Sequence, residues 1–240
     1  MRVITCENYE KMSKVAASMV KAQIVLKPNS VLGLATGSTP EGMYAALAEW
    51  HKMHGLDFSE VKTFNLDEYY PIDRENDQSY YYFMDKHLYS KINIKKENAH
   101  VPNGNASDVD AECANYDKNI DAAGGIDLQI LGIGSNGHVG FNEPGPELTA
   151  GTHKVTLTEG TIKDNSRFFA SEAEVPKHAL TSGMATIMKA KKIVIMVSGK
   201  NKAVPLKKLL SGKITTDCPA TMLNMHPDVV VIADKDAMEG

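Results

Sequence analysis

The stretch from residue 132 to residue 144, GIGSNGHVGFNEP, carries the side chains best suited to proton transfer. It places His138 and Glu143 among four glycines, directly after an apolar run. An imidazole exchanges protons near neutral pH, and a nearby carboxylate can fix its tautomer and raise its pKa. Glycines permit tight turns and close approach of the backbone to a ligand. A single histidine is more often structural than catalytic, but this setting favours acid–base chemistry at His138.

The same stretch contains the spacing Gly132-x-Gly134-x-x-Gly137, which superficially matches a dinucleotide-binding fingerprint. That fingerprint requires an acidic ribose ligand further along the chain. Residues 156–158, Thr-Leu-Thr, offer none there, so the match is weak.

Two adjacent carboxylates, Asp67 and Glu68, follow the apolar run at residues 61–66. A carboxylate at the mouth of a cleft is placed to act as a general base. Neighbouring side chains on an extended chain point in opposite directions, so we expect only one of the two to face a substrate. The alternative interpretation is a solvated turn or a helix cap.

A phosphate site is predicted at residues 36–40, TGSTP, between a strand and a helix. The backbone N–H groups of Gly37, Ser38 and Thr39, with the two hydroxyls, can donate to an anion at a helix N-terminus. An ordinary capped turn would have the same residue types. No Gly-Lys-Ser/Thr follows, so the stretch is not a P-loop.

An anionic substrate also needs cations, and the candidates are Arg167 in NSRFF and Lys202 after Gly199. A guanidinium can grip a phosphate with two N–H groups, whereas an ammonium acts as a point charge. Most surface Arg and Lys side chains are only solvated, so these two residues depend on the other motifs for support.

The elements that must position these residues alternate between apolar runs and stretches of helical period, which is typical of a parallel α/β sheet. A count of roughly six strands is low for an eight-stranded barrel. We therefore predict an open, doubly wound, mostly parallel, Rossmann-like sheet flanked by helices. The expected strands are residues 2–5, 31–35, 61–66, 127–132, 192–197 and 229–233. The expected helices are residues 7–26, 41–54, 79–89, 110–123, 182–189 and 201–210, with the aromatic run 80–83 in the core.

Ligands of such sheets bind outside the carboxyl ends of the strands, so the polar stretches after residues 35, 66 and 132 should converge on one crevice. Residues 147–177 are polar with weak periodicity, apart from a strand-like piece at 154–157, and we expect them to form a lid. No repeat or linker interrupts the chain, which predicts a single domain over residues 1–240.

Composition limits the class of protein. The net charge of −4 argues against a nucleic-acid partner, and no apolar run is long enough to span a bilayer. The three cysteines form no CxxC pair, which argues against a zinc site or a disulfide framework. We expect a cytoplasmic protein with no bound metal that acts on a small molecule.

Taken together, the motifs resemble those of the glucosamine-6-phosphate deaminase family over nearly the whole chain. The pair FNLDEYY and NGHVGFNEP is highly specific. The matching sequences are GLATGSTP (33–40), TFNLDEYY (63–70), SYYYFM (79–84), NGNASDVDAEC (103–113), GIGSNGHVGFNEP (132–144), NSRFF (165–169) and the turn at 199–202. The resemblance implies isomerisation and deamination of the sugar phosphate glucosamine 6-phosphate, giving fructose 6-phosphate and ammonia, without a metal or organic cofactor.

The resemblance also implies a role for each site residue. Asp67 would remove the C2 proton and later protonate C1. His138 would open the pyranose ring. Glu143 would orient the His138 imidazole and balance its charge. Asn136 stands where some members have aspartate, so it can hydrogen-bond His138 but stabilises its cation less. The 6-phosphate would be held by Gly37, Ser38, Thr39, Arg167 and Lys202.

Regulation is expected to differ from that of the allosteric, hexameric members. Those members use a basic pair after the Glu-Pro motif and an extended C-terminal tail. This chain has His153 and Val155 at the matching positions and ends at Gly240. We therefore expect a non-allosteric enzyme, either a monomer or a small homo-oligomer.

Two other functions occur on the same fold. One is a 6-phosphogluconolactonase-like hydrolase, in which the FNLDEYY and NGHVGFNEP pair is not expected. The other is a sugar-phosphate-sensing module of transcription regulators, which needs the phosphate site but not Asp67, His138 and Glu143. The sequence has no basic N-terminal helix-turn-helix, which also argues against an intact regulator.

Overall fold

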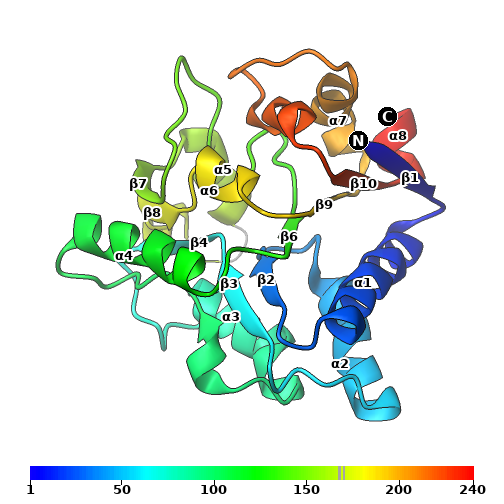
Figure 1. Cartoon of the computed structure of the whole chain (residues 1–240). Helices are drawn as coiled ribbons and strands as arrows, with labels where there is room; N and C mark the ends of the chain where they lie inside the picture. Colours follow the sequence, from blue (N-terminus) through cyan, green and yellow to red (C-terminus); the bar gives the residue numbers. More distant parts are fainter. Residues whose placement is uncertain (167–168, 170) are drawn as a thin grey trace.

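The computed structural model describes residues 1–166, 169 and 171–240 of the chain. Within these residues, seven parallel strands form the main sheet and three antiparallel strands form a second, smaller sheet (Figure 1). The strands of the main sheet, in spatial order, are β1 (Arg2–Cys6), β10 (Val229–Asp234), β9 (Ile193–Val197), β6 (Leu128–Leu131), β2 (Val31–Leu34), β3 (Lys62–Asn65) and β5 (Ala99–His100).

The order of these strands confirms the predicted open, doubly wound sheet. From the edge strand β1 the chain enters the middle of the sheet at β2 and proceeds outward through β3 to β5. It then returns to β6, on the other side of β2, and proceeds through β9 to β10 beside β1. The direction of winding therefore reverses between β2 and β6, and ligands of such sheets bind at this point, outside the carboxyl ends of the strands.

Helices cover both faces of the main sheet (Figure 1). One core packs α1 and α2 against alternate strand residues such as Val194 and Met196, and the other packs α4, α6 and α7 against Ile193 and Ile195. The helices are α1 (Tyr9–Leu26), α2 (Glu41–His54), α3 (Tyr80–His87), α4 (Val109–Ala122), α5 (Glu159–Asn165), α6 (Met184–Met188), α7 (Ala203–Leu210) and α8 (Lys235–Glu239). Short 3₁₀ helices lie at Tyr89–Lys91, Lys96–Asn98, Glu172–Glu174, Lys200–Lys202 and Pro219–Met225.

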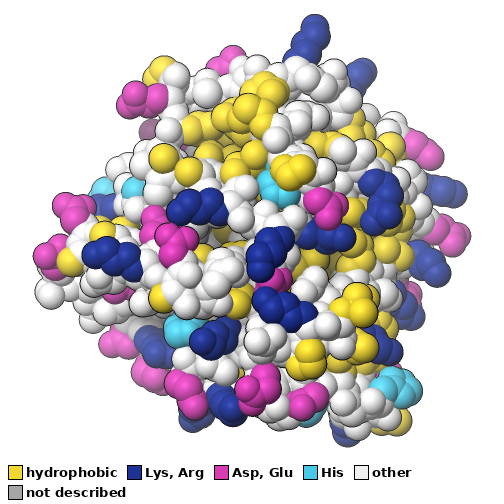
Figure 2. All heavy atoms as spheres, viewed as in Figure 1, with side chains coloured by type: hydrophobic (Ala, Val, Ile, Leu, Met, Phe, Trp, Pro, Cys, Tyr) yellow, Lys and Arg dark blue, Asp and Glu magenta, His cyan; other side chains and the backbone are white. Residues whose placement is uncertain are grey.

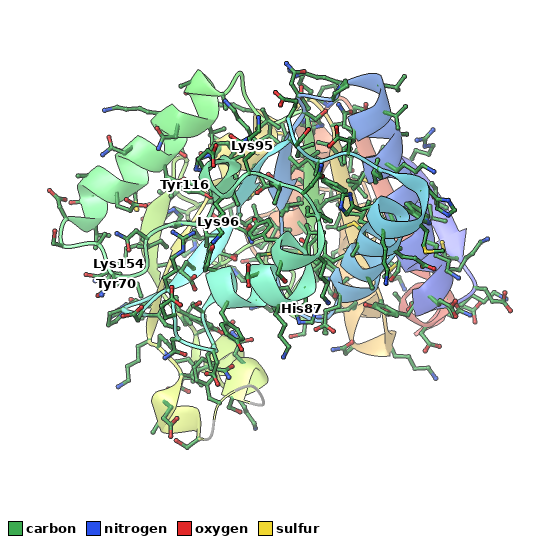
Figure 3. The ribbon with its side chains drawn as sticks, turned by 90° about the horizontal axis from the view of Figure 1, so that it is seen from below. Tyr70, His87, Lys95, Lys96, Tyr116 and Lys154 are labelled. Atoms are coloured by element: carbon green, nitrogen blue, oxygen red, sulfur yellow. The ribbon has the colours of Figure 1, made fainter. Side chains whose placement is uncertain are left out.

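The smaller sheet is built in the order β4 (Asp67–Tyr70), β8 (His178–Thr181) and β7 (His153–Thr156). Only Leu66 separates β4 from β3, so the chain passes directly from one sheet to the other. At the outer side of this sheet, Lys154 Nζ lies 5.1 Å from the centroid of the Tyr70 ring (Figure 3). The small sheet stands beside the carboxyl end of β3, where it forms one wall of the site described below.

Several elements differ from the predicted ones. Strands β4, β5 and β8 were not predicted, because they are only two to four residues long and β4 begins with two carboxylates. The strand-like piece predicted at residues 154–157 is β7, whereas α5, in the same predicted lid at 147–177, was not predicted. The predicted helix at 201–210 begins as a 3₁₀ turn and becomes α-helical only at Ala203, and α8 follows the last strand.

Among the described residues, no helix is both long and apolar enough to cross a membrane. On the face that Figure 2 shows, acidic and basic side chains are interspersed around the molecule.

Candidate active site

The loops that follow β2, β3, β6 and β9 line one cleft of about 1340 Å³. This confirms the expectation that the polar stretches converge on one crevice. Asn136 and Glu143 do not line the cleft themselves, but both contact His138, which does. Arg167 lies outside the described residues. The predicted site residues that line the cleft are Gly37, Ser38, Thr39, Asp67, His138 and Lys202.

Asp67 and Glu68 open β4 and turn their side chains apart, as expected for neighbouring strand residues. Asp67 lines the cleft, although its side chain is almost buried. Glu68 instead accepts hydrogen bonds from the backbone N–H groups of Tyr80 (2.8 Å) and Tyr81 (3.0 Å) at the start of α3, and from Tyr69 N (2.9 Å). The position of Asp67 is thus fixed by a strand on one side and a capped helix on the other.

The surroundings of Asp67 disfavour its charged form. Burial, with a smaller contribution from the Glu68 charge, raises the pKa of the Asp67 carboxyl to about 8. Burial also raises the pKa of Glu68, to about 7, against the opposing effect of its backbone hydrogen bonds. A carboxylate held in this way is a stronger base than one in water, and its pKa lies close to working pH, where general bases are most effective.

Aromatic rings form the apolar wall beside Asp67. Tyr80 stacks on Phe141 with ring centroids 6.1 Å apart, and Tyr69 packs against both. All three rings line the cleft. The prediction that the run 80–83 belongs to the core was wrong for Tyr82, which is 41% exposed. Tyr80 packs against the core cluster that contains Tyr69 and Phe141, and it also lines the cleft. An α3 that borders a cleft presents its aromatic face to the ligand space, which hydrophobic periodicity alone cannot distinguish from a core.

Helix α4 supports the end of β3, directly before β4. The Tyr116 hydroxyl, labelled in Figure 3, donates to the backbone carbonyl of Asn65 at 2.8 Å, two residues before Asp67. On the other side, Gly140 has a φ of +58°, and a Cβ there would come within 2.9 Å of Thr181 Oγ1 and 3.5 Å of Asp67 Oδ2. Glycine at this position therefore keeps the space in front of Asp67 open.

His138, Glu143 and Asn136 form one hydrogen-bonded group. Glu143 Oε2 lies 3.3 Å from His138 Nδ1 and accepts from Asn136 Nδ2 at 2.6 Å. Asn136 Oδ1 accepts from the backbone N–H of His138 at 3.1 Å. Because a carboxylate faces Nδ1, that nitrogen carries the proton in the neutral imidazole, and Nε2 is the nitrogen that can exchange a proton with a ligand.

Glu143 remains ionised despite its burial. Burial alone would raise the pKa of its carboxyl. The hydrogen bond and the charge of His138 outweigh this effect, together with the hydrogen bonds from Thr161 and Asn136, so the pKa of Glu143 is lowered. The Thr161 hydroxyl of α5 donates to Glu143 Oε1 at 2.5 Å. Both carboxylate oxygens therefore have donors, and the pair His138–Glu143 is held in a fixed orientation.

Two glycines allow the loop to hold His138 in place. The imidazole lies so close to Gly134 that a Cβ there would be 2.4 Å from its Nε2 atom. Gly137 has a φ of +96°, and a Cβ there would be 2.4 Å from Cys218 Sγ. The carbonyl of Gly137 also accepts from Ala220 N at 2.9 Å. The segment at 218–220 thus supports the histidine loop from behind.

The phosphate end of the cleft is formed by residues 36–39 at the start of α2. Gly37 has a φ of +92°, which an L side chain rarely adopts. Tyr9, the first residue of α1, holds this loop, since its hydroxyl donates to the carbonyl of Ser38 and accepts from Gly42 N, both at 2.9 Å. His87, at the end of α3 that faces α2, lines the cleft nearby (Figure 3).

Lys202 reaches the same cleft from the turn after β9. Asp234, at the end of β10, holds this turn by accepting from Gly199 N at 3.1 Å and from the Ser198 hydroxyl. Asp234 also accepts from Ala237 N at 2.8 Å and so caps α8. One buried carboxylate therefore links the C-terminal strand to the cationic side of the cleft.

Sequence reasoning missed three supporting residues of this site, namely Tyr9, Thr161 and Asp234. Each lies far in sequence from the residue that it supports, and an isolated Tyr, Thr or Asp carries no motif. Among the described residues, no group of three or more His, Cys, Asp or Glu side chains could hold a metal ion.

A family model described as glucosamine-6-phosphate isomerases/6-phosphogluconolactonase matches residues 7–232. The chain belongs to this family.

Within the glucosamine-6-phosphate isomerase/6-phosphogluconolactonase family, the chain is more similar to deaminases than to lactonases. It is 58% identical to a glucosamine-6-phosphate deaminase of Thermoanaerobacter pseudethanolicus over 99% of this chain and 94% of that protein. The solved structure of a monomeric glucosamine-6-phosphate deaminase matches with a TM-score of 0.97 and 45% identity, over 99% and 98% of the two chains. A 6-phosphogluconolactonase from Trypanosoma cruzi shares the fold, with a TM-score of 0.80, 21% identity and coverage of 100% and 96%.

Proposed function

We propose that this protein is a glucosamine-6-phosphate deaminase, which converts glucosamine 6-phosphate and water into fructose 6-phosphate and ammonia. The observation that carries the proposal is the placement of a buried carboxylate, Asp67, and a carboxylate-oriented imidazole, His138, on one cleft that also has a phosphate loop. The 58% identity to a deaminase supports the same substrate.

The phosphate group anchors the sugar in this proposal. The N–H groups of residues 37–39 lie at the start of α2, where the helix dipole favours an anion, and Lys202 adds a positive charge. Arg167 remains a proposed ligand on the basis of the family resemblance. Binding at this end positions C1 and C2 near the acid–base groups, which converts a bimolecular proton transfer into an intramolecular one.

Ring opening is assigned to His138. Its Nε2 atom shuttles a proton between the anomeric hydroxyl and the ring oxygen, so that the pyranose becomes the open-chain aldehyde. Glu143 stabilises the transient imidazolium, and Asn136 holds Glu143 in place. No net proton is gained or lost in this step.

Isomerisation is assigned to Asp67. Its carboxylate removes the proton from C2 while O1 takes up a proton from the substrate ammonium, which gives a neutral enolamine. Asp67 then delivers the proton that it holds to C1, which gives the protonated fructosimine and regenerates the carboxylate. Water adds to the C=N bond, and the carbinolamine expels ammonia to leave the ketone. General acid–base catalysis with positioning is sufficient for each step.

Several further properties belong to this proposal. The enzyme acts in amino-sugar catabolism in the cytoplasm, as a non-allosteric monomer or small homo-oligomer, with residues 1–240 as one catalytic domain and without nucleic-acid or membrane partners. The monomeric deaminase of similar structure supports the oligomeric state. A sigmoidal rate curve that N-acetylglucosamine 6-phosphate made hyperbolic would contradict the absence of allostery.

The experiment that tests the proposed function compares two substrates with the purified protein. Formation of fructose 6-phosphate from glucosamine 6-phosphate, without hydrolysis of 6-phosphogluconolactone, is the expected result. Lactone hydrolysis alone would support the hydrolase alternative, and binding of sugar phosphate without turnover would support the sensor.

A further inference from the structure

The Thr161 hydroxyl joins helix α5 to the carboxylate of Glu143. Thr161 is 5% exposed, lines the cleft and donates to Glu143 Oε1 at 2.5 Å. The Thr158 hydroxyl donates to Thr161 Oγ1 at 3.1 Å. An ionised carboxylate can only accept hydrogen bonds, so the single proton of the Thr161 hydroxyl is directed at Glu143.

Thr161 contacts the one carboxylate oxygen of Glu143 that neither Asn136 nor His138 contacts. Asn136 and His138 both contact Oε2 of Glu143, at 2.6 Å and 3.3 Å, whereas Thr161 contacts Oε1. Two contacts on one oxygen fix a point, and a third on the other oxygen fixes the plane of the carboxylate. Without the Thr161 hydroxyl, the carboxylate can rotate about its own axis and move Oε2 away from His138.

The donor comes from a different part of the chain than its acceptor. Glu143 lies in the loop after β6, but α5 follows β7 of the small sheet, and its Lys163 and Asn165 line the same cleft. The N-cap of α5 is Thr158, whose side chain accepts from Thr161 N. The orientation of Glu143 therefore depends on the packing of α5 over the cleft.

We propose that Thr161 is a positioning residue for ring opening, because its hydroxyl holds Glu143 against His138 only when α5 is packed on the cleft. The inference rests on the proposed function. Thr161 exchanges no proton with the sugar, and it acts only through the carboxylate of Glu143.

The first test compares Thr161→Val, which keeps the shape of the side chain but removes the donor, with Thr161→Ser, which keeps the hydroxyl. Loss of a hydrogen bond to a charged group should lower kcat for ammonia release about tenfold in Thr161→Val. Thr161→Ser should recover most of that loss. Thr156→Val, the same substitution at an exposed position of β7, is the matched control and should behave as wild type. Equal losses in Thr161→Val and Thr161→Ser would overturn the proposal.

A double-mutant cycle with Glu143→Gln tests whether Thr161 acts through Glu143. If it does, Thr161→Val should cause little further loss in a Glu143→Gln background, since coupled residues are not additive. The reduced, open-chain alditol of the substrate has no ring to open, so Thr161→Val should bind it as wild type does. Additive losses in the cycle, or alditol binding weakened as much as kcat, would show a general loosening of the cleft and overturn the inference.

Failure of the inference can be told apart from failure of the proposed function. Absence of ammonia release by the wild-type protein would contradict the function alone. In that case crystal structures of the two Thr161 variants test the positioning directly. Glu143 Oε2 should leave His138 Nδ1 in Thr161→Val and stay in Thr161→Ser, and an unchanged carboxylate in Thr161→Val would overturn the inference.

Discussion

Asp67 and Glu68 are adjacent in β4, yet of the two only Asp67 faces the cleft. Glu68 accepts hydrogen bonds from the backbone N–H groups of Tyr80 and Tyr81 at the start of α3. The two carboxylates thereby divide their roles. Glu68 fixes the helix that borders the cleft, and its charge also helps to raise the pKa of the Asp67 carboxyl. A structural carboxylate in this position therefore tunes the proposed base next to it.

The first prediction concerns Glu68→Gln. Removing the Glu68 charge lowers the pKa of Asp67, which burial and Glu68 raise to about 8. Because Asp67 must be ionised to accept a proton, kcat/KM for ammonia release should decrease as the pH drops below this pKa. In Glu68→Gln, this acidic limb of the pH profile should move to lower pH. The substrate amine titrates identically in both assays, so a shift identifies an enzyme group. Glu60→Gln, an exposed partner of Lys95, is the control, and equal profiles for wild type and Glu68→Gln would contradict the prediction.

The second prediction concerns the stability of Asp67→Asn. The folded-state pKa of Asp67 is raised to about 8, so between the unfolded pKa and pH 8 the folded state binds more protons than the unfolded state. The stability of the wild type therefore declines as pH rises through this range, and Asn, which has no proton to lose, avoids the decline. Asp67→Asn should exceed the wild type in free energy of unfolding at pH 8.5 by on the order of 5 kcal/mol, and by much less at pH 4. Urea unfolding at both pH values measures this, and a pH-independent difference would contradict it.

The third prediction concerns Asn136→Asp. Asn136 donates to Glu143 Oε2, whereas an aspartate would place a second carboxylate beside the same imidazole. The added negative charge stabilises the imidazolium form of His138, so the limb of the kcat–pH profile that depends on this imidazole should move to higher pH in Asn136→Asp. The pH dependence of kcat measures the effect. Asn136→Ala removes the hydrogen bonds without adding a charge, so it separates the two causes. Identical profiles for wild type and Asn136→Asp would show that position 136 does not control the pH dependence of kcat.

The fourth prediction concerns Tyr9→Phe. The Tyr9 hydroxyl ties Ser38 to Gly42 and so holds the phosphate loop in shape. Its loss should raise KM for glucosamine 6-phosphate about three- to tenfold with little change in kcat, because the loop binds substrate and transition state alike. Inorganic phosphate should also inhibit the variant more weakly. Tyr70→Phe, which removes a hydroxyl bonded to Ala106 outside the cleft, is the control. An unchanged KM in Tyr9→Phe would contradict the prediction and would show that the Tyr9 hydroxyl contributes to the stability of the fold but not to substrate binding.

The strands buried on both faces of the main sheet were predicted from the sequence. The runs at 31–35, 127–132 and 192–197 became β2, β6 and β9, because strands buried on both faces are continuously apolar. Strand β4 was not predicted, since its first two residues are carboxylates that are buried only through the cleft and the α3 cap. Such burial depends on tertiary contacts that no local pattern records.

The candidate site divides in the same way. The residues of the 132–144 motif and Asp67 stood out because their types are unusual directly after apolar strands. Thr161 and Tyr9 did not, since each is a common residue on a helix that meets the site only in three dimensions. The assignment of Arg167 to the phosphate stays a prediction, as does closure of the segment 147–177. Unequal hydrogen-exchange protection of that segment with and without a substrate analogue would support closure.

The most direct test of the central claim is ammonia release from glucosamine 6-phosphate at pH 8.5 by wild type, by chelator-treated wild type and by Asp67→Asn. We predict stoichiometric ammonia and fructose 6-phosphate from the wild type, unchanged release after chelation, and a loss of at least about a thousandfold in Asp67→Asn, with sugar-phosphate binding retained. Absence of release from the wild type, or release by Asp67→Asn at the wild-type rate, would contradict the account.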